Sequence, residues 1–275
     1  MVLPNEMPPV DIATTGRCVI WFSCGAASTV AAKIALTERP DALVCYIDTG
    51  SEHEDTERYR SDVARWLNRP IQVLRSPDYV DVDDVIERTR YIVGVHGARC
   101  TTELKIKVRR AFQQPDDVQV FGFDARPKEV KRAIEFRENY PEVNLWTPLI
   151  DSGLDKSDCH QLVARAGIRQ HAMYELGYKN ANCIGCVKGS LGYWNKIRVD
   201  FPEVFARRAR QEREIGHAIC STEVRINGRR DKIPVFLDEL EPGRGNYAAE
   251  VEHECGVFCA GVEATWTDEE EACDV

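Results

Sequence analysis

Short apolar runs alternate with helical patterns through the first half of the chain. The apolar runs are rich in residues that favour β-strands, and they predict strands at residues 17–22, 42–47, 72–74 and 118–121. Apolar residues at helical spacing predict helices at residues 29–38, 54–67, 102–112 and 126–138. Strands that alternate with helices of this length form βαβ units. We therefore predict an α/β fold with a parallel sheet and helices on both of its faces.

The pattern changes near residue 151, where short helices, cysteines and aromatic residues replace the strand signals. We interpret residues 1–150 as a nucleotide-binding core. Residues 151–275 are interpreted as a smaller, mostly helical, cysteine-bearing extension that packs on this core and ends in an acidic tail. The length of 275 residues suits one large α/β domain with an appended module.

Composition and charge narrow the class of protein. Hydrophobic residues make up 43% and charged residues 29%, the balance of a globular protein. No apolar run approaches the ~20 residues that span a bilayer, and we predict a cytoplasmic protein with no membrane association. The net charge is −9, and the last 28 residues carry nine acids and no Lys or Arg. Residues 1–247 are therefore neutral, which does not favour a large nucleic-acid surface.

A loop of small residues follows the first predicted strand and leads into a predicted helix. The start of a helix presents backbone N–H groups to an anion, and small side chains let a phosphate approach closely. Ser23 and Ser28 add hydroxyl donors. In open parallel sheets ligands bind at the carboxyl ends of the strands, so we expect a site at residues 23–28 and 48–56. Many loops of this kind are small and polar for packing reasons alone.

The cysteines suggest a metal centre. Eleven cysteines in a cytoplasmic chain do not indicate a disulfide framework, because that compartment keeps thiols reduced. Cys183 and Cys186 form a C-x2-C pair, and Cys255 and Cys259 form a C-x3-C pair. Two close pairs can supply four thiolates to one centre, either a structural zinc or an iron–sulfur cluster. The alternative is two unrelated buried pairs.

The loop also carries a resemblance to a known family. Its sequence is similar to the PP-loop, Ser-Gly-Gly-x-Asp-Ser, of the ATP pyrophosphatase and phosphoadenosine phosphosulfate (PAPS) reductase superfamily. The chain matches at three positions and differs at three others: Ser23, Gly25 and Ser28 match, whereas Cys24, Ala26 and Ala27 stand where the family has Gly, often Lys, and Asp. Further matches follow in order at 46–50, 54–57, 99–107, 121–122, 145–151, 174–178 and 183–186.

The resemblance implies an enzyme that binds ATP, cleaves it to AMP and pyrophosphate, and adenylates an acceptor for sulfur transfer. Residues 23–28 and Gly122 would border the phosphates, with Mg²⁺ bridging them, and Ser23 and Ser28 would act in catalysis. Asp48, Thr49 and Gly50 would border the adenosine. Lys105, with Lys107 or Arg109, would offset the developing negative charge. Expected partners are an adenine nucleotide, a sulfur donor protein and a nucleic-acid acceptor, and we expect a homo-oligomer.

The resemblance also favours a [4Fe–4S] cluster over zinc, held by Cys183, Cys186, Cys255 and Cys259, with Cys100 as a competing ligand. A second function remains open, because residues 254–256 resemble the C-terminal motif of PAPS reductases. There the cysteine attacks the sulfonyl sulfur, so Cys255 would be the nucleophile of a PAPS or adenylylsulfate reductase with thioredoxin as reductant. A third possibility is a non-catalytic nucleotide-binding module with a structural zinc.

Overall fold

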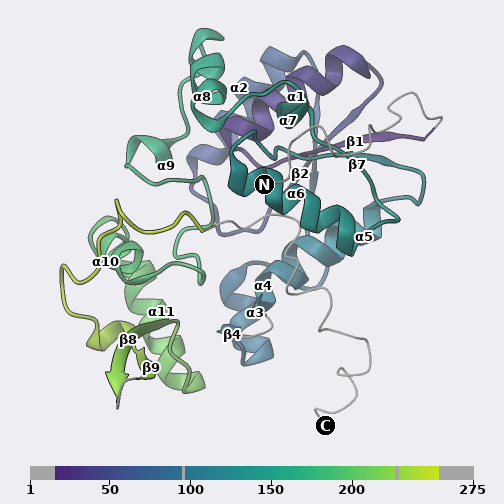
Figure 1. Cartoon of the computed structure of the whole chain (residues 1–275). Helices are drawn as coiled ribbons and strands as arrows, with labels where there is room; N and C mark the ends of the chain where they lie inside the picture. Colours follow the sequence, from purple (N-terminus) through teal and green to yellow (C-terminus); the bar gives the residue numbers. More distant parts are fainter. Residues whose placement is uncertain (1–15, 95–96, 227–228, 254–275) are drawn as a thin grey trace. The chain divides into compact units, whose positions relative to one another are not determined.

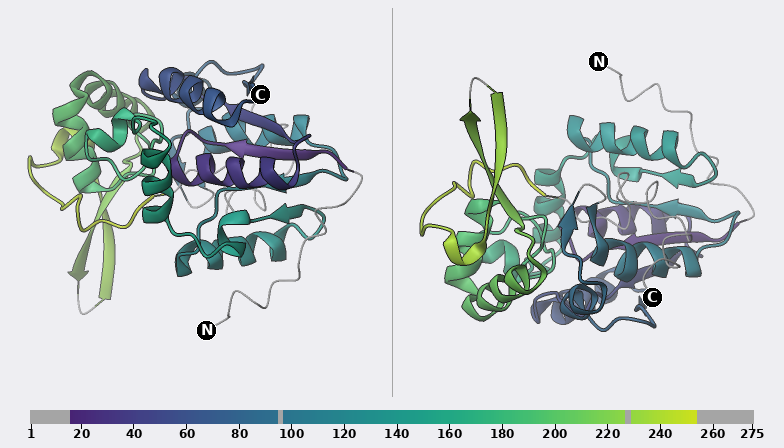
Figure 2. Two further views of the ribbon diagram at one scale, coloured as in Figure 1. Left: turned by 90° about the horizontal axis from the view of Figure 1, so that it is seen from above. Right: turned by 90° about the horizontal axis from the view of Figure 1, so that it is seen from below.

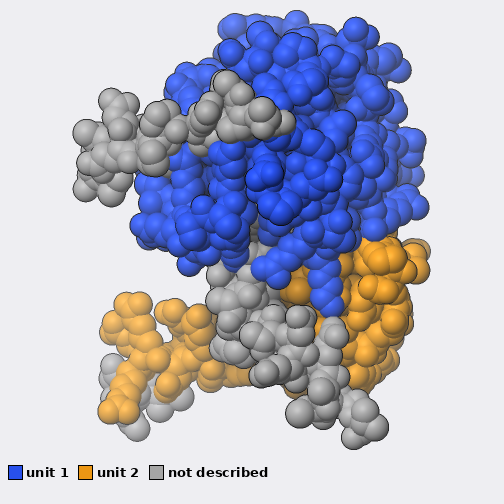
Figure 3. Space-filling view, turned by 90° about the vertical axis from the view of Figure 1, so that its right-hand side faces the viewer, with its two compact units in different colours: residues 1–48, 53–75, 106–181 blue, residues 49–52, 76–105, 182–275 orange. Residues whose placement is uncertain are grey.

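The computed structural model describes residues 16–94, 97–226 and 229–253. The chain forms two compact units (Figure 3). Unit 1 comprises residues 1–48, 53–75 and 106–181, and unit 2 comprises residues 49–52, 76–105 and 182–275. The chain therefore passes between the two units five times. Residue 150 lies inside unit 1, and a domain division at that position stays a prediction.

Unit 1 contains a parallel sheet, of which Figure 1 labels β1, β2 and β7. Its five strands lie in the order β3-β2-β1-β6-β7. The strands are β1 (Cys18–Phe22), β2 (Leu43–Ile47), β3 (Ile71–Leu74), β6 (Val118–Val120) and β7 (Asn144–Trp146). The chain builds the sheet from β1 towards β3 on one side and then adds β6 and β7 on the other. The order thus reverses between β1 and β6, the point at which open α/β sheets hold their ligands.

Helices cover both faces of this sheet. The helices of unit 1 are α1 (Ala26–Glu38), α2 (Asp55–Leu67), α5 (Lys107–Phe112), α6 (Pro127–Asn139), α7 (Pro148–Asp151), α8 (Lys156–Arg165) and α9 (Ala172–Glu175). Residues of α1, α2 and α8 share one apolar core with Ile20 and Phe22 of β1. On the opposite face, the ring of Trp21 packs edge-on against Phe112 of α5 at 6.0 Å. The predicted α/β fold is confirmed.

The sequence explains the central strand and the helix beside it. All five residues of β1 are buried, which fits an unbroken apolar run in a strand covered on both faces. Ala31, Ala32 and Ala35 of α1 are at most 1% exposed, and their small side chains let the helix lie close to the sheet. The helix begins at Ala26, three residues before the predicted start, because the loop turns into it directly after Gly25.

The predicted helix at 102–112 is more complex in the structure. It begins with a short turn, α4 (Arg99–Thr101), continues as a π-helical segment (Thr102–Ile106) and ends as α5. An ion pair of 2.7 Å between Arg99 and Glu103 spans the junction between α4 and the π-helical segment. Extra residues in π-helical turns are frequent at functional sites.

Unit 2 is a mostly helical, cysteine-bearing unit with two hairpins, which confirms the predicted character of the C-terminal extension. Besides α4 and the π-helical segment as far as Lys105, its elements are α3 (Val82–Thr89), β4 (Val93–Gly94), β5 (Gly97–Ala98), α10 (Leu191–Asp200), α11 (Pro202–Ile215), β8 (Cys220–Ile226), β9 (Arg229–Val235) and the 3-10 turn η3 (Leu237–Glu239). A small apolar core joins residues of α3 to Leu104, Cys183 and Val187. In the described part of the chain, no helix combines the length and apolar character needed to cross a bilayer.

Candidate functional site

The loop at residues 23–28 lies at the carboxyl end of β1 and opens into α1. Gly25 is the N-cap residue, with an extended backbone and no side-chain hydrogen bond to the first turn. The first turn of α1 contains no acidic residue. The first backbone N–H groups of a helix have no partner within the helix, and they add to the positive end of its dipole. This end of α1 is therefore suited to an anion.

The two serines of the loop have different surroundings. Ser28 is 5% exposed, and its hydroxyl accepts hydrogen bonds from the Ser23 N–H and the Ser23 hydroxyl, each at 3.1 Å. It also donates to the carbonyl of Gly25 at 3.0 Å. Ser23 is exposed. Ser28 thus holds the loop closed, whereas the side chain of Ser23 is accessible to solvent.

Cys24 occupies the left-handed region, with a φ of +57°. This conformation is disfavoured for a residue with a Cβ and natural for glycine. The Cys24 side chain is 1% exposed and belongs to the main apolar core. Its thiol therefore points away from the solvent-facing side of the loop.

A second loop, after β6, meets the first. A Cβ added at Gly122 would lie 2.8 Å from the Ser28 nitrogen and 2.9 Å from the Ser28 Cα, so only glycine lets the two backbones approach. Two residues further on, Asp124 is 2% exposed and accepts hydrogen bonds from the backbone N–H and the guanidinium of Arg126 at 2.8 to 3.1 Å. This pairing fixes the loop after β6. Gly122 and Ser28 were predicted to share a site, and they lie together.

The predicted adenosine-binding residues divide between the two units. Asp48 belongs to unit 1, where its carboxylate accepts two hydrogen bonds from Arg75 at 2.9 and 2.5 Å. Thr49 and Gly50 belong to unit 2. Gly50 has a φ of +69°, and a Cβ there would lie 2.3 Å from the carbonyl oxygen of Val80. A glycine is therefore required at position 50, because any Cβ there would clash with the backbone of Val80.

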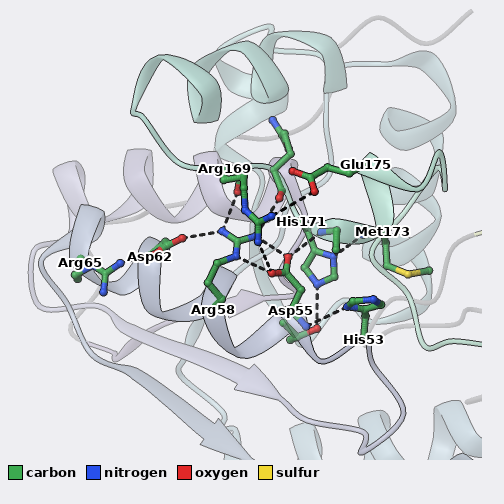
Figure 4. Close-up of polar contacts among 12 residues, drawn as sticks. His53, Asp55, Arg58, Asp62, Arg65, Arg169, His171, Met173 and Glu175 are labelled. Carbon is green, nitrogen blue, oxygen red and sulfur yellow. Dashed lines mark hydrogen bonds and ion pairs between the residues drawn. The ribbon is translucent and has the colours of Figure 1, made fainter.

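A charged cluster, not predicted from the sequence, ties the start of α2 to the segment before α9 (Figure 4). Asp55 accepts hydrogen bonds from Arg58 at 2.7 and 2.6 Å, from Arg169 at 2.9 Å and from the Ala172 N–H at 2.8 Å. Arg58 also donates to the backbone carbonyls of Arg169 and Gln170. The hydrogen bonds from Arg58 lower the pKa of Asp55 to about 2. We call Asp55, Arg58, Arg169 and His171 the α2–α9 latch.

His171 is the buried member of the latch, at 1% exposed. Its Nδ1 accepts a hydrogen bond from the Met173 N–H at 3.2 Å, so Nε2 carries the proton and donates to the Thr56 hydroxyl at 3.0 Å. Burial lowers the pKa of His171 to about 4. His53 lies beside it, with ring centroids 6.1 Å apart. His171 is therefore a neutral structural group at neutral pH.

Tyr174 follows the latch in the chain and lies beside the loop at residues 23–28. A Cβ built on Gly25 would be 3.4 Å from the Tyr174 hydroxyl, so this hydroxyl lies over the loop backbone. The ring packs edge-on against His160 at 4.7 Å. From the sequence alone, Tyr174 is only one position of a family motif at residues 174–178. Its contact with residue 25 joins positions 149 residues apart, which no local pattern records.

Comparison with known families decides the identity of this fold. Residues 17–191 match the family model described as the phosphoadenosine phosphosulfate reductase domain. The chain belongs to this family. Among solved structures it is similar to the phosphoadenylyl-sulfate (PAPS) reductase from Candida auris in a phosphate complex, with 11% sequence identity and a TM-score of 0.48. That alignment covers 63% of this chain and 84% of the other. No curated protein matches the chain.

The basic residues proposed for this PAPS reductase-family chain occupy three environments. Lys105 is half-buried in the π-helical segment of unit 2, and Lys107 is exposed. Arg109 is 1% exposed and donates to the Gln113 side chain at 2.6 Å. Gln113 in turn accepts a hydrogen bond from Gln119 of β6, so Arg109 belongs to a partly buried polar network that joins α5 to the sheet. Lys105 and Lys107 remain the candidates for contact with a ligand.

The C-x2-C cysteine pair of this chain lies in a tight turn of unit 2. Cys183 and Cys186 are each 6% exposed, and Gly185 between them has a φ of +70°. The Thr49 hydroxyl lies 3.0 Å from the Cys183 sulfur. Cys100 packs against the same apolar core as Cys183. Two shielded thiols on one turn fit a soft metal centre in the chemistry of their donors.

The other proposed ligands, Cys255 and Cys259, lie outside the described residues. Across residues 16–94, 97–226 and 229–253, no three His, Cys, Asp or Glu side chains are grouped to hold a metal ion. The proposed four-cysteine centre therefore stays a prediction, and so does the nucleophilic role of Cys255.

Proposed function

We propose that this PAPS reductase-family protein is a PP-loop enzyme that cleaves ATP to AMP and pyrophosphate and so activates an acceptor for sulfur transfer. One observation carries the proposal. The N-terminus of α1 has no side-chain cap and no acidic residue in its first turn, at the reversal point of the sheet. A nucleotide phosphate supplies the negative charge that this position favours.

The neighbouring residues support phosphate binding in complementary ways. The backbone N–H groups of residues 25–28 would donate to the phosphate oxygens. The exposed Ser23 hydroxyl would add a donor by turning its proton from Ser28 to the phosphate. The Tyr174 hydroxyl, which lies near Gly25, would add a further donor. Gly122 keeps the space beside Ser28 clear of side-chain atoms. Ala26 and Ala27 supply no charge, so Mg²⁺ bound to ATP and Lys105 are the proposed sources of positive charge.

The proposed reaction has two steps. An acceptor oxygen attacks the α-phosphorus, the bond from that phosphorus to the bridging oxygen breaks, and pyrophosphate leaves with the bonding electrons. Any proton on the acceptor oxygen passes to solvent. A sulfur nucleophile from a sulfur donor protein then displaces AMP from the adenylated acceptor. The chain's own contribution is to orient ATP and to stabilise the charge that develops on pyrophosphate.

We also propose a [4Fe–4S] cluster on Cys183, Cys186, Cys255 and Cys259, with Cys100 as a competing ligand and zinc as the alternative metal. Burial of Cys183 and Cys186 in one turn supports this assignment. When bound, such a cluster would carry or position the sulfur to be transferred.

The test is to measure AMP and pyrophosphate release from ATP by protein purified without oxygen. Ser23→Ala is expected to lower the rate about tenfold, the loss of one hydrogen bond to a charged group. Ser61→Ala, at an exposed position on α2, is the matched control and should leave the rate unchanged.

The family description makes a sulfonucleotide reductase the second candidate. If the protein ignores ATP but releases sulfite from PAPS or adenylylsulfate with thioredoxin, and Cys255→Ser abolishes that activity, the reductase function replaces the proposal. Nucleotide binding with neither turnover would instead indicate a binding module.

A further inference from the structure

The hairpin of β8 and β9 is an extended, largely exposed ribbon. Seven cross-strand pairs join the strands, from Cys220 opposite Val235 to Ile226 opposite Arg229. Among the hairpin side chains that the structure describes, the buried ones are at the base, where Cys220 is 4% and Val235 is 7% exposed, and the rest of β9 is exposed. The ribbon extends beyond the helices of its own unit (Figure 2). An isolated two-stranded hairpin is marginally stable, and in the described part of the chain no third strand joins this one.

The charges on the ribbon are predominantly positive. It holds four basic and two acidic side chains, a net charge of +2 on a chain whose total is −9. The basic residues are Arg225, Arg229, Arg230 and Lys232, and the acidic ones are Glu223 and Asp231. Three of the four basic residues lie in the two pairs nearest the turn. The positive charge is therefore concentrated at the outer end.

Two of these arginines face each other. Arg225 is directly opposite Arg230, and directly opposed residues of an antiparallel pair share one face. Arg230 is 71% exposed, and its ion pair with Glu223 has a length of 3.8 Å. Arg225 and Arg229 form no ion pair with any residue that the structure describes. Like charges in direct opposition destabilise a hairpin, and charges of either sign would protect an exposed edge. The opposed arginines therefore point to an anionic partner.

We propose that the β8–β9 hairpin is an arm that binds double-stranded DNA through its phosphates. A two-stranded ribbon is of the right size for the major groove of B-form DNA, whereas the major groove of A-form RNA is too narrow. Guanidinium groups match phosphate oxygens with paired hydrogen bonds. Bound phosphates also neutralise the repulsion between Arg225 and Arg230. Binding through this arm gives the protein a macromolecular partner, and the proposed cleavage of ATP does not itself require that partner.

The opposed pair gives the proposal a distinctive signature. Arg225→Glu places a carboxylate opposite Arg230, so the unfolding midpoint of the variant is expected to equal or exceed that of the wild type. The same change removes a phosphate contact and adds repulsion, so the affinity for DNA is expected to fall about tenfold or more. A residue that only supported the fold would lose stability and binding together.

The test measures the anisotropy of a labelled DNA duplex of about two helical turns against the full chain at several salt concentrations. For the double variant R225S/R230S, the slope of log affinity against log salt should decrease by about 2, one unit for each lost phosphate contact. Lys131→Glu on α6, where the side chain is 77% exposed, changes the net charge as much as Arg225→Glu and is the control.

Three outcomes overturn the proposal. The wild type binds no duplex, or Lys131→Glu weakens binding as much as Arg225→Glu, or duplex RNA binds as tightly as DNA. AMP release is measured on the same samples. Arg225→Glu should leave it unchanged, so failure of the DNA arm is distinguishable from failure of the proposed ATP chemistry.

Discussion

At the scale of single residues, Cys24 combines a left-handed backbone with a buried side chain. We predict that Cys24→Gly is more stable than Cys24→Ala by about 1 kcal/mol, because glycine adopts this conformation without the steric cost of a Cβ. Both variants lose the thiol, so the comparison isolates the backbone. Denaturant unfolding of the two proteins is the measurement. Equal stabilities would mean that the backbone at residue 24 is unstrained.

Tyr174 provides a second prediction at this scale. Tyr174→Phe retains the ring that packs on His160 and removes only the hydroxyl over Gly25. We expect the affinity for ATP to fall about tenfold, the effect of one hydrogen bond to a charged group. Titration calorimetry measures it, with Tyr79→Phe as the control, where the ring that lies 4.4 Å from Arg88 is kept. Unchanged affinity would remove Tyr174 from the phosphate site.

The residues of the loop show how far the sequence predicts a site. Ser23, Ser28 and Gly122 could be placed together, because they follow strands that end at one edge of a parallel sheet. The separate roles of the two serines could not be predicted, because they depend on which hydroxyl turns towards the carbonyl of Gly25. That choice is made by the fold of the loop.

At the scale of elements, the α2–α9 latch predicts a pH dependence of stability. The pKa of His171 is about 4 in the folded protein and near 6.5 in the unfolded chain. Between these values the unfolded state binds more protons, so the free energy of unfolding falls as the pH is lowered from 6.5 to 4. The full loss is about 3 kcal/mol.

His171→Asn tests this dependence. An Asn oxygen can accept the Met173 N–H as Nδ1 does, yet it does not titrate. We expect the variant to lose most of the slope of stability between pH 6.5 and pH 4 in denaturant titrations. His217→Asn is the control, because His217 is exposed and lies in unit 2. A slope that His171→Asn leaves intact would assign the titration to another group.

Asp55 gives a further prediction for the same latch. Asp55→Asn is expected to destabilise the protein by about 2 kcal/mol, because Arg58 and Arg169 lose their shared carboxylate. The pKa of Asp55 is depressed to about 2, so this stabilisation is present above pH 4 and is lost as the pH falls towards 2. The difference between variant and wild type should therefore shrink at low pH. A constant difference would contradict the assignment.

The elements also show why part of the structure escaped prediction. Strand β1 and helix α1 follow from local apolar patterns, and both were placed within a few residues. In the latch, Asp55 accepts a hydrogen bond from Ala172, 117 residues away, and the polar side chains of the latch carry no periodic signal. The residue spacing of the π-helical segment is close to that of an α-helix, so the apolar pattern of the sequence does not distinguish the two.

At the scale of the whole molecule, metal content is the most informative prediction. Protein purified without oxygen is expected to contain about four iron and four sulfide per chain. Cys183→Ser should lose the iron and the visible absorbance, whereas Cys100→Ser should retain both if Cys255 and Cys259 complete the centre. One zinc per chain without sulfide would contradict the cluster. Loss of iron in Cys100→Ser would make Cys100 a ligand.

Hydrophobic patterns could not predict the two units. Residues 49–52 and 76–105 pack in unit 2, although strands of unit 1 precede them in the chain. A helical pattern such as that of α3 shows that one face is buried, but it does not show which core the face joins. That information lies in contacts between distant segments, and a single sequence does not display them.

The five crossings between the units have a consequence for how such a protein evolves. A module encoded by one continuous stretch of a gene can be lost or exchanged by a single recombination event. Here, removal of unit 2 requires the excision of three separate stretches, two of them internal to unit 1. We therefore expect the loop at residues 23–28 and the cysteine turn to be inherited together, and descendants of this gene to diversify by substitution and loop growth instead of by exchange of whole units.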